Sequence, residues 1–146
     1  MFDNLAFAVK RLEAFHKKIS TFCATRGGWR ANMERAKIHM ERRAAEKHDY
    51  LRIGVTDEMV AAILIQGLLI PDKCFTGSPI EIVVDGVLSA VKYVDRDNLT
   101  EVVEKDICVR VMVRERPKKH LVVTAYPLRG ADANAQAPRV SHEEIW

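Results

Sequence analysis

Hydrophobic residues in the first part of the chain recur at three- and four-residue steps, which is typical of amphipathic helices. This spacing predicts a helix over residues 4–23, with Asp3 as a candidate N-cap and Gly27-Gly28 as the stop signal. A second helix is predicted over residues 29–47, where the apolar face is thinner and most other positions are basic.

A third helix is the most clearly delimited element of this half. Thr56 is a candidate N-cap, and the acidic pair Asp57-Glu58 suits the positive end of a helix. Gly67 is the candidate C-cap. The first half is therefore expected to be helical.

After residue 79 the hydrophobic period changes to two, which indicates strands. Asp85-Gly86 has the composition of a two-residue hairpin turn, and Pro117 lies in a second expected turn. The predicted strands cover residues 80–84, 87–94, 107–114 and 120–126. Short connections favour antiparallel pairing, so we expect an α+β fold in which N-terminal helices pack on a roughly four-stranded antiparallel sheet.

Charge is unevenly distributed along the 146 residues. Residues 1–55 hold 12 Lys/Arg against 6 Asp/Glu, whereas residues 56–146 hold 11 against 14. A basic helical half fits either a polyanionic partner or an ordinary solvated surface. Cys23, Cys74 and Cys108 show no metal-binding spacing, and we expect no metal and no cofactor.

The last two predicted strands hold the residues best suited to chemistry. If the chain turns near Pro117, Arg110 lies opposite Thr124 and Arg114 opposite His120, with Tyr126 on the same face. Arginine can clamp a phosphate, histidine can move a proton near neutral pH, and hydroxyl groups can position the phosphate. The alternative is that this face is the polar side of an ordinary half-buried sheet.

A second group of basic residues precedes the third helix. It consists of His39, Arg42, Arg43, His48 and Arg52. Residues four apart share a helix face, so His39 pairs with Arg43, and His48 pairs with Arg52 if the helix extends that far. The group is either part of a site or the solvated end of a basic helix.

Together the two groups resemble a known family. The run from His48 to Val60 contains Arg52-Ile-Gly-Val-Thr56, and a strand-rich region later ends in Val122-Val-Thr124-Ala-Tyr126-Pro. These features resemble the barnase, EndoU, colicin nuclease and RelE-like ribonuclease superfamily, over roughly residues 38–128. Many of its members are bacterial toxin domains. The longer N-terminal helix pair and the tail depart from the family pattern.

The resemblance implies a site and a division of the chain. Its catalytic residues would be His48, Arg52, Arg110, Thr124 and Tyr126, with Arg43, Arg114 and His120 binding substrate. His39 is the alternative match for the family histidine. Residues 1–128 would form one domain, with 1–47 as a helical extension and 48–128 as a nuclease-like core, followed by a mobile tail over 129–146.

Three functions are compatible with these patterns. The resemblance favours a metal-independent ribonuclease that acts on RNA in the cytoplasm, with tRNA among the candidate substrates. It also implies a cognate inhibitor or immunity protein as a partner. Such a ribonuclease could be delivered from outside as part of a larger protein. The basic half equally suits an RNA- or protein-binding module of the same fold. The third is a helical-hairpin interaction domain with a structural sheet.

Overall fold

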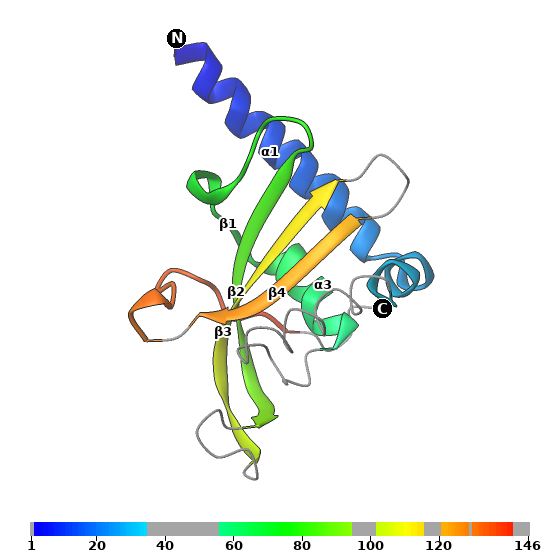
Figure 1. Ribbon diagram of the computed structural model, residues 1–146, viewed down its shortest axis with the longest axis vertical. Coiled ribbons are helices and arrows are strands. Elements are labelled where there is room, and N and C mark those ends of the chain that lie inside the picture. The colour runs from blue at the N-terminus through cyan, green and yellow to red at the C-terminus, as the bar shows by residue number, and fades with distance from the viewer. Residues whose placement is uncertain (1, 35–55, 95–101, 116–120, 129, 142–146) are drawn as a thin grey trace.

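A computed structural model describes residues 2–34, 56–94, 102–115, 121–128 and 130–141 (Figure 1). Helix α1 covers Phe2–Cys23, a second helical segment covers residues 26–34, and α3 covers Asp57–Gln66. The strands are β1 (Leu68–Leu69), β2 (Glu81–Val94), β3 (Val102–Glu115) and β4 (Leu121–Leu128), and two 3-10 turns are η1 (Pro71–Lys73) and η2 (Gly130–Asp132). The expected α+β class, with helices preceding a four-stranded antiparallel sheet, is confirmed.

The sheet is a meander with the order β1-β2-β3-β4, and every neighbouring pair is antiparallel. One face is the core face, where alternate residues of β2, β3 and β4 are buried against α1 and α3 (Figure 1). Leu12 and Ile19 of α1, and Ile63 of α3, belong to this core. The period-two alternation leaves the opposite face for the polar residues of β3 and β4.

Helix α3 has the caps that its sequence indicates. The Thr56 side chain accepts a hydrogen bond from the Met59 backbone N–H, and the Gly67 N–H donates to the Ile63 carbonyl at 2.7 Å. A Cβ atom on Gly67 would lie 2.4 Å from the Ile63 carbonyl oxygen and 2.7 Å from that of Asp85. Glycine therefore allows the chain to pass directly from α3 into β1.

Replacing Gly67 with alanine should destabilise the domain by about 1–3 kcal/mol, because both close atoms belong to the backbone and cannot move alone. Urea unfolding followed by circular dichroism measures the effect. Gly27→Ala is the matched control, since nothing lies within 4 Å of its Cβ position and its stability should be unchanged or slightly raised. Equal effects of the two substitutions would contradict this account of Gly67.

The expected hairpin turn at Asp85-Gly86 is wrong. Both residues lie inside β2, a single strand of 14 residues whose partner is β3. Among the described glycines only Gly130 has a positive φ, so Gly86 does not use the turn conformation that suggested it. The predicted strands over 80–84 and 87–94 are thus parts of the single strand β2, which begins at Glu81, and β1 supplies the remaining strand.

Several predicted boundaries also move. Gly27-Gly28 does not stop the first helix, which ends at Cys23, because both glycines lie in the helical segment that begins at residue 26. That segment starts three residues earlier than expected. Asp3 lies within α1 rather than before it. Strand β3 begins at Val102, earlier than the predicted residue 107.

Residues 130–141, which we call the strap, were expected to belong to a mobile tail but are packed on the sheet. Val140 is buried in the core cluster, and its N–H donates to the Val87 carbonyl at 3.0 Å. Asn134 donates to Asp85, which lies on the polar face. The strap therefore leads from the end of β4, over the polar face, to the edge of β2 that β3 does not occupy (Figure 1).

Candidate functional site

The polar face of the β3–β4 pair brings together several of the predicted site residues. Arg110 is the register partner of Tyr126, and Met112 is the partner of Thr124. Residues 107–114 and 121–126 are therefore adjacent antiparallel strands with Arg110 and Thr124 on one face, as predicted. The register differs from the expected one by two residues, because the ladder closes at Glu115 and Leu121. Arg114 consequently lies opposite Val122, not His120.

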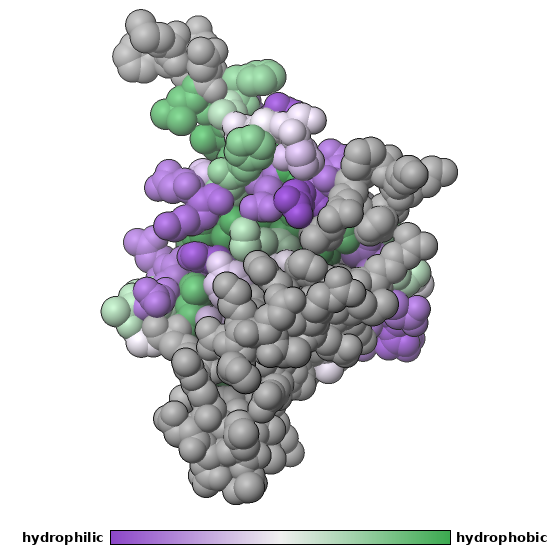
Figure 2. Space-filling view, viewed as in Figure 1, coloured by the Kyte–Doolittle hydropathy of each residue, from purple (hydrophilic) through white to green (hydrophobic). Residues whose placement is uncertain are grey.

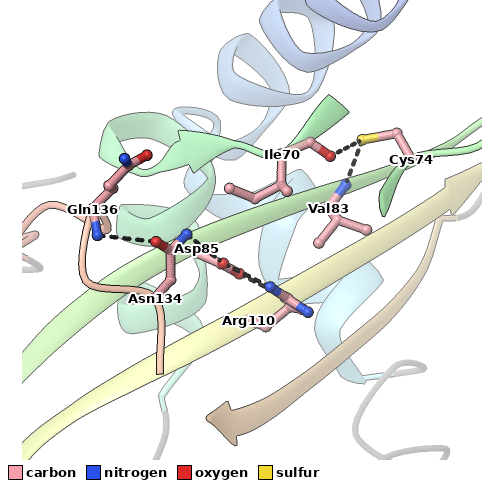
Figure 3. Close-up of polar contacts among 7 residues, drawn as sticks. All are labelled: Ile70, Cys74, Val83, Asp85, Arg110, Asn134 and Gln136. Atoms are coloured by element: carbon pink, nitrogen blue, oxygen red, sulfur yellow. Dashed lines mark hydrogen bonds and ion pairs between the residues drawn. The ribbon is translucent and has the colours of Figure 1, made fainter. Parts of the chain in front are cut away.

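At the centre of this face Arg110 forms an ion pair with Asp85, its cross-strand partner on β2 (Figure 3). The Arg110 Nε donates to Asp85 Oδ1 at 2.8 Å and Nη2 donates to Oδ2 at 2.9 Å. The Asp85 side chain is 0% exposed and that of Arg110 is 17% exposed. Such bidentate geometry satisfies both carboxylate oxygens of Asp85 and offsets part of the cost of removing the pair from water.

A third hydrogen bond to Asp85 comes from the strap. The Asn134 Nδ2 donates to Asp85 Oδ2 at 3.0 Å, and Asn134 in turn accepts from the Gln136 N–H at 2.9 Å (Figure 3). Hydrogen bonding to Asp85, and more weakly to Tyr126, raises the pKa of Arg110 above its ordinary value. The guanidinium is therefore permanently charged and held in one orientation.

Cys108 lies two residues from Arg110 on the same face, half-buried. Burial is the largest effect and raises the pKa of its thiol. The Asn134 backbone hydrogen bond lowers this pKa, the Asp85 carboxylate raises it, and Arg110 has the smallest effect, a lowering. Burial also raises the pKa of Cys23 to about 12 and that of Cys74 above its ordinary value. Because the thiolate is the reactive form, none of the three is suited to nucleophilic catalysis at neutral pH.

The other predicted residues divide into two groups. Arg114 is exposed, whereas Thr124 and Tyr126 are half-buried. His39, Arg42, Arg43, His48 and Arg52 lie outside the described residues, and so does His120. The histidine roles therefore stay predictions. The Nε2 atom of His16, in α1, lies 2.6 Å from the Leu64 carbonyl oxygen.

Sequence reasoning missed Asp85 and Asn134 as members of this cluster. The available signal was an acidic residue within the apolar run Ile82-Val-Val-Asp-Gly-Val-Leu88. A charge inside such a run requires a buried partner, and Arg110 has a matching position in the next strand. Because the Asp85-Gly86 dipeptide is typical of a hairpin turn, Asp85 was not interpreted as a buried, paired charge within a strand.

The described part of the chain contains no group of three or more His, Cys, Asp or Glu side chains arranged to hold a metal ion. Within the same residues, no helix combines the length and the apolar character needed to cross a membrane. No family model, curated protein or solved structure matches the chain, so the residues themselves have to support any functional conclusion.

Proposed function

We propose that this chain is a metal-independent ribonuclease. One observation carries the proposal: Arg110, Thr124 and Tyr126 share one face of adjacent strands, with the Arg110 guanidinium fixed by Asp85. The arrangement of helices followed by a four-stranded antiparallel sheet adds support, because members of the ribonuclease superfamily that the chain resembles pair a helical segment with such a sheet.

The proposed reaction is attack of an RNA 2′-OH on the adjacent phosphorus. A base removes the 2′ proton, the bond from phosphorus to the 5′ oxygen breaks, an acid protonates that oxygen, and a cyclic phosphate remains. His48 is assigned the proton transfers because an imidazole titrates near neutral pH. Arg52 and Arg43, which also precede α3 in the sequence, are assigned to phosphate binding.

On the sheet, Arg110 has five N–H donors and gives two of them to Asp85. Asp85 offsets the positive charge of Arg110. Arg110 would therefore hold phosphate oxygens by directed hydrogen bonds rather than by the electrostatic attraction of a net charge. The exposed Arg114 on the same face would supply positive charge. His120, which lies outside the described residues, is assigned to substrate binding together with Arg114. Thr124 and Tyr126 would place their hydroxyls against the phosphate.

A non-catalytic RNA- or protein-binding module is the second candidate. The same Asp85–Arg110 pair favours it, because a neutralised arginine also suits a purely structural role. Apolar residues gather at the N-terminal end of α1, where Leu5 and Phe7 are 73% and 69% exposed (Figure 2). Further along α1, Lys10 and Lys17 are exposed, which suits an acidic partner.

Incubation with total RNA in EDTA distinguishes the two functions. A ribonuclease should yield discrete fragments ending in cyclic phosphate, and the corresponding 2′-deoxy substrate should stay intact because it has no nucleophile. Binding that weakens steeply with salt, without cleavage, would favour the module. Cleavage that is lost in EDTA and restored by Mg²⁺ or Zn²⁺ would contradict metal independence.

A further inference from the structure

The strap occupies an edge of β2 beside Val87. The Val87 N–H donates to the Pro138 carbonyl at 2.8 Å, and the Val140 N–H donates to the Val87 carbonyl at 3.0 Å, so that Arg139 forms a parallel bridge with Val87. Both backbone groups of Val87 are therefore satisfied by the strap. Without it this edge would present an unpaired donor and acceptor, which is a template for another strand.

Next to these bonds, the Val140 side chain is buried against Gly86 and Ile63, and we call the space that it occupies the Gly86–Ile63 pocket. A Cβ atom on Gly86 would lie 3.1 Å from Val140 Cγ1 and 3.2 Å from Ile63 Cγ1. Because Gly86 has no side chain, it leaves space for the branched side chain of Val140. Glycines within strands often occur where another chain segment approaches closely. This is the structural reason for the glycine that resembled a turn residue.

Polar groups on both sides of the pocket hold the neighbouring residues. The Arg139 Nη1 donates to Asp106 Oδ2 at 2.7 Å and to Ser89 Oγ at 3.0 Å, where the β2–β3 register shifts. The Gln66 side-chain amide donates to the Ser141 carbonyl at 2.8 Å and accepts from its N–H at 3.0 Å. Backbone pairing, one apolar pocket and one acidic contact are the elements of peptide recognition by strand addition.

The strap buries little of its own surface, although several hydrogen bonds hold it on this edge. Val140 is its buried residue, Asn134 and Ala137 are half-buried, and the remaining strap residues are exposed. Its pairing with β2 is a single bridge, whereas β2 and β3 pair over most of their length. Segments with so few buried contacts open locally more readily than the core does.

We propose that this edge of β2 is a docking site for an extended peptide of a partner protein. The peptide would run parallel to β2 and carry a basic residue followed by a small branched apolar residue, to meet Asp106 and the Gly86–Ile63 pocket. Residues 138–141 of the strap occupy the same site as an intramolecular ligand that such a peptide displaces. The proposal rests on the strap contacts alone and does not depend on ribonuclease activity.

The test uses the full chain and a fluorescent peptide of residues 133–141, with binding followed by anisotropy. In the Val140→Asp variant the chain's own strap no longer competes, so the peptide should bind at least about 10-fold more tightly than to the unsubstituted chain. A control peptide that itself carries Val140→Asp should not bind. Adding Asp106→Asn to the variant chain should weaken binding several-fold.

A second variant covers the case in which Val140→Asp perturbs folding. Arg139→Glu removes the exposed Asp106 contact, introduces repulsion there, and leaves the buried valine unchanged. It should also bind the peptide more tightly than the unsubstituted chain does. If neither variant gains affinity for the peptide, or if Val140→Asp unfolds the chain and Arg139→Glu gains none, the strap is an integral part of the core and the proposal is overturned.

Discussion

Replacing Asp85 with alanine should lower the free energy of unfolding by about 3–5 kcal/mol. The substitution leaves the Arg110 guanidinium with little exposure and without its carboxylate, and an uncompensated buried charge is among the most destabilising changes in a protein. It also removes the acceptor for Asn134. Urea unfolding, with the midpoint and the slope both measured, gives the value.

The control is the apolar pair Asp85→Leu with Arg110→Met. Because both charges are removed together, the double variant should recover most of the stability that Asp85→Ala loses. Comparing the two variants separates the destabilisation by an unpaired charge from the net contribution of the ion pair to the free energy of unfolding. If Asp85→Ala were as stable as the unsubstituted chain, the Asp85 carboxylate would not compensate for the Arg110 charge in solution.

The pair also has a role in strand register. Shifting β2 by two residues along β3 keeps every apolar side chain on its own face, so the hydrophobic pattern alone does not exclude the shift. Such a shift would place Asp85 opposite Cys108 or Met112 and leave two buried charges unpaired. The double apolar variant is therefore expected to pair its strands less specifically even when its stability is restored.

His48→Ala should reduce RNA cleavage by roughly 10²-fold or more while leaving the fold intact. The 2′-OH is a poor nucleophile until its proton is removed, and the leaving 5′ oxygen must gain one, so loss of the imidazole affects both steps. Initial cleavage rates of a defined RNA in EDTA, with circular dichroism as the folding check, measure the effect.

His39→Ala and His120→Ala are the matched controls for this prediction. Normal cleavage by His48→Ala together with loss in either of the others would move the proton-transfer role to that histidine. Full activity of all three variants would exclude a histidine mechanism.

Several features of the fold follow from local sequence. The three-to-four-residue spacing places α1, and the Thr56 and Gly67 caps place α3, because helix ends depend on residues only a few positions away. The period-two alternation places Arg110, Thr124 and Tyr126 on one face for every register that differs by an even number of residues, because an even offset preserves the face. The same alternation also places the core residues of β3, which are Ile107, Val109, Val111 and Val113.

Only the tertiary structure determined that Asp85-Gly86 lies within a strand rather than in a turn. As a local signal the dipeptide indicates a turn, yet it lies within a strand because the carboxylate meets Arg110, 25 residues further along, and the glycine makes room for Val140. The packing of the strap, which has little apolar content to signal it, depends on the same distant contacts. Local propensities describe a residue and its neighbours, whereas a buried charge or a missing Cβ acquires its role from groups that only the fold brings within reach.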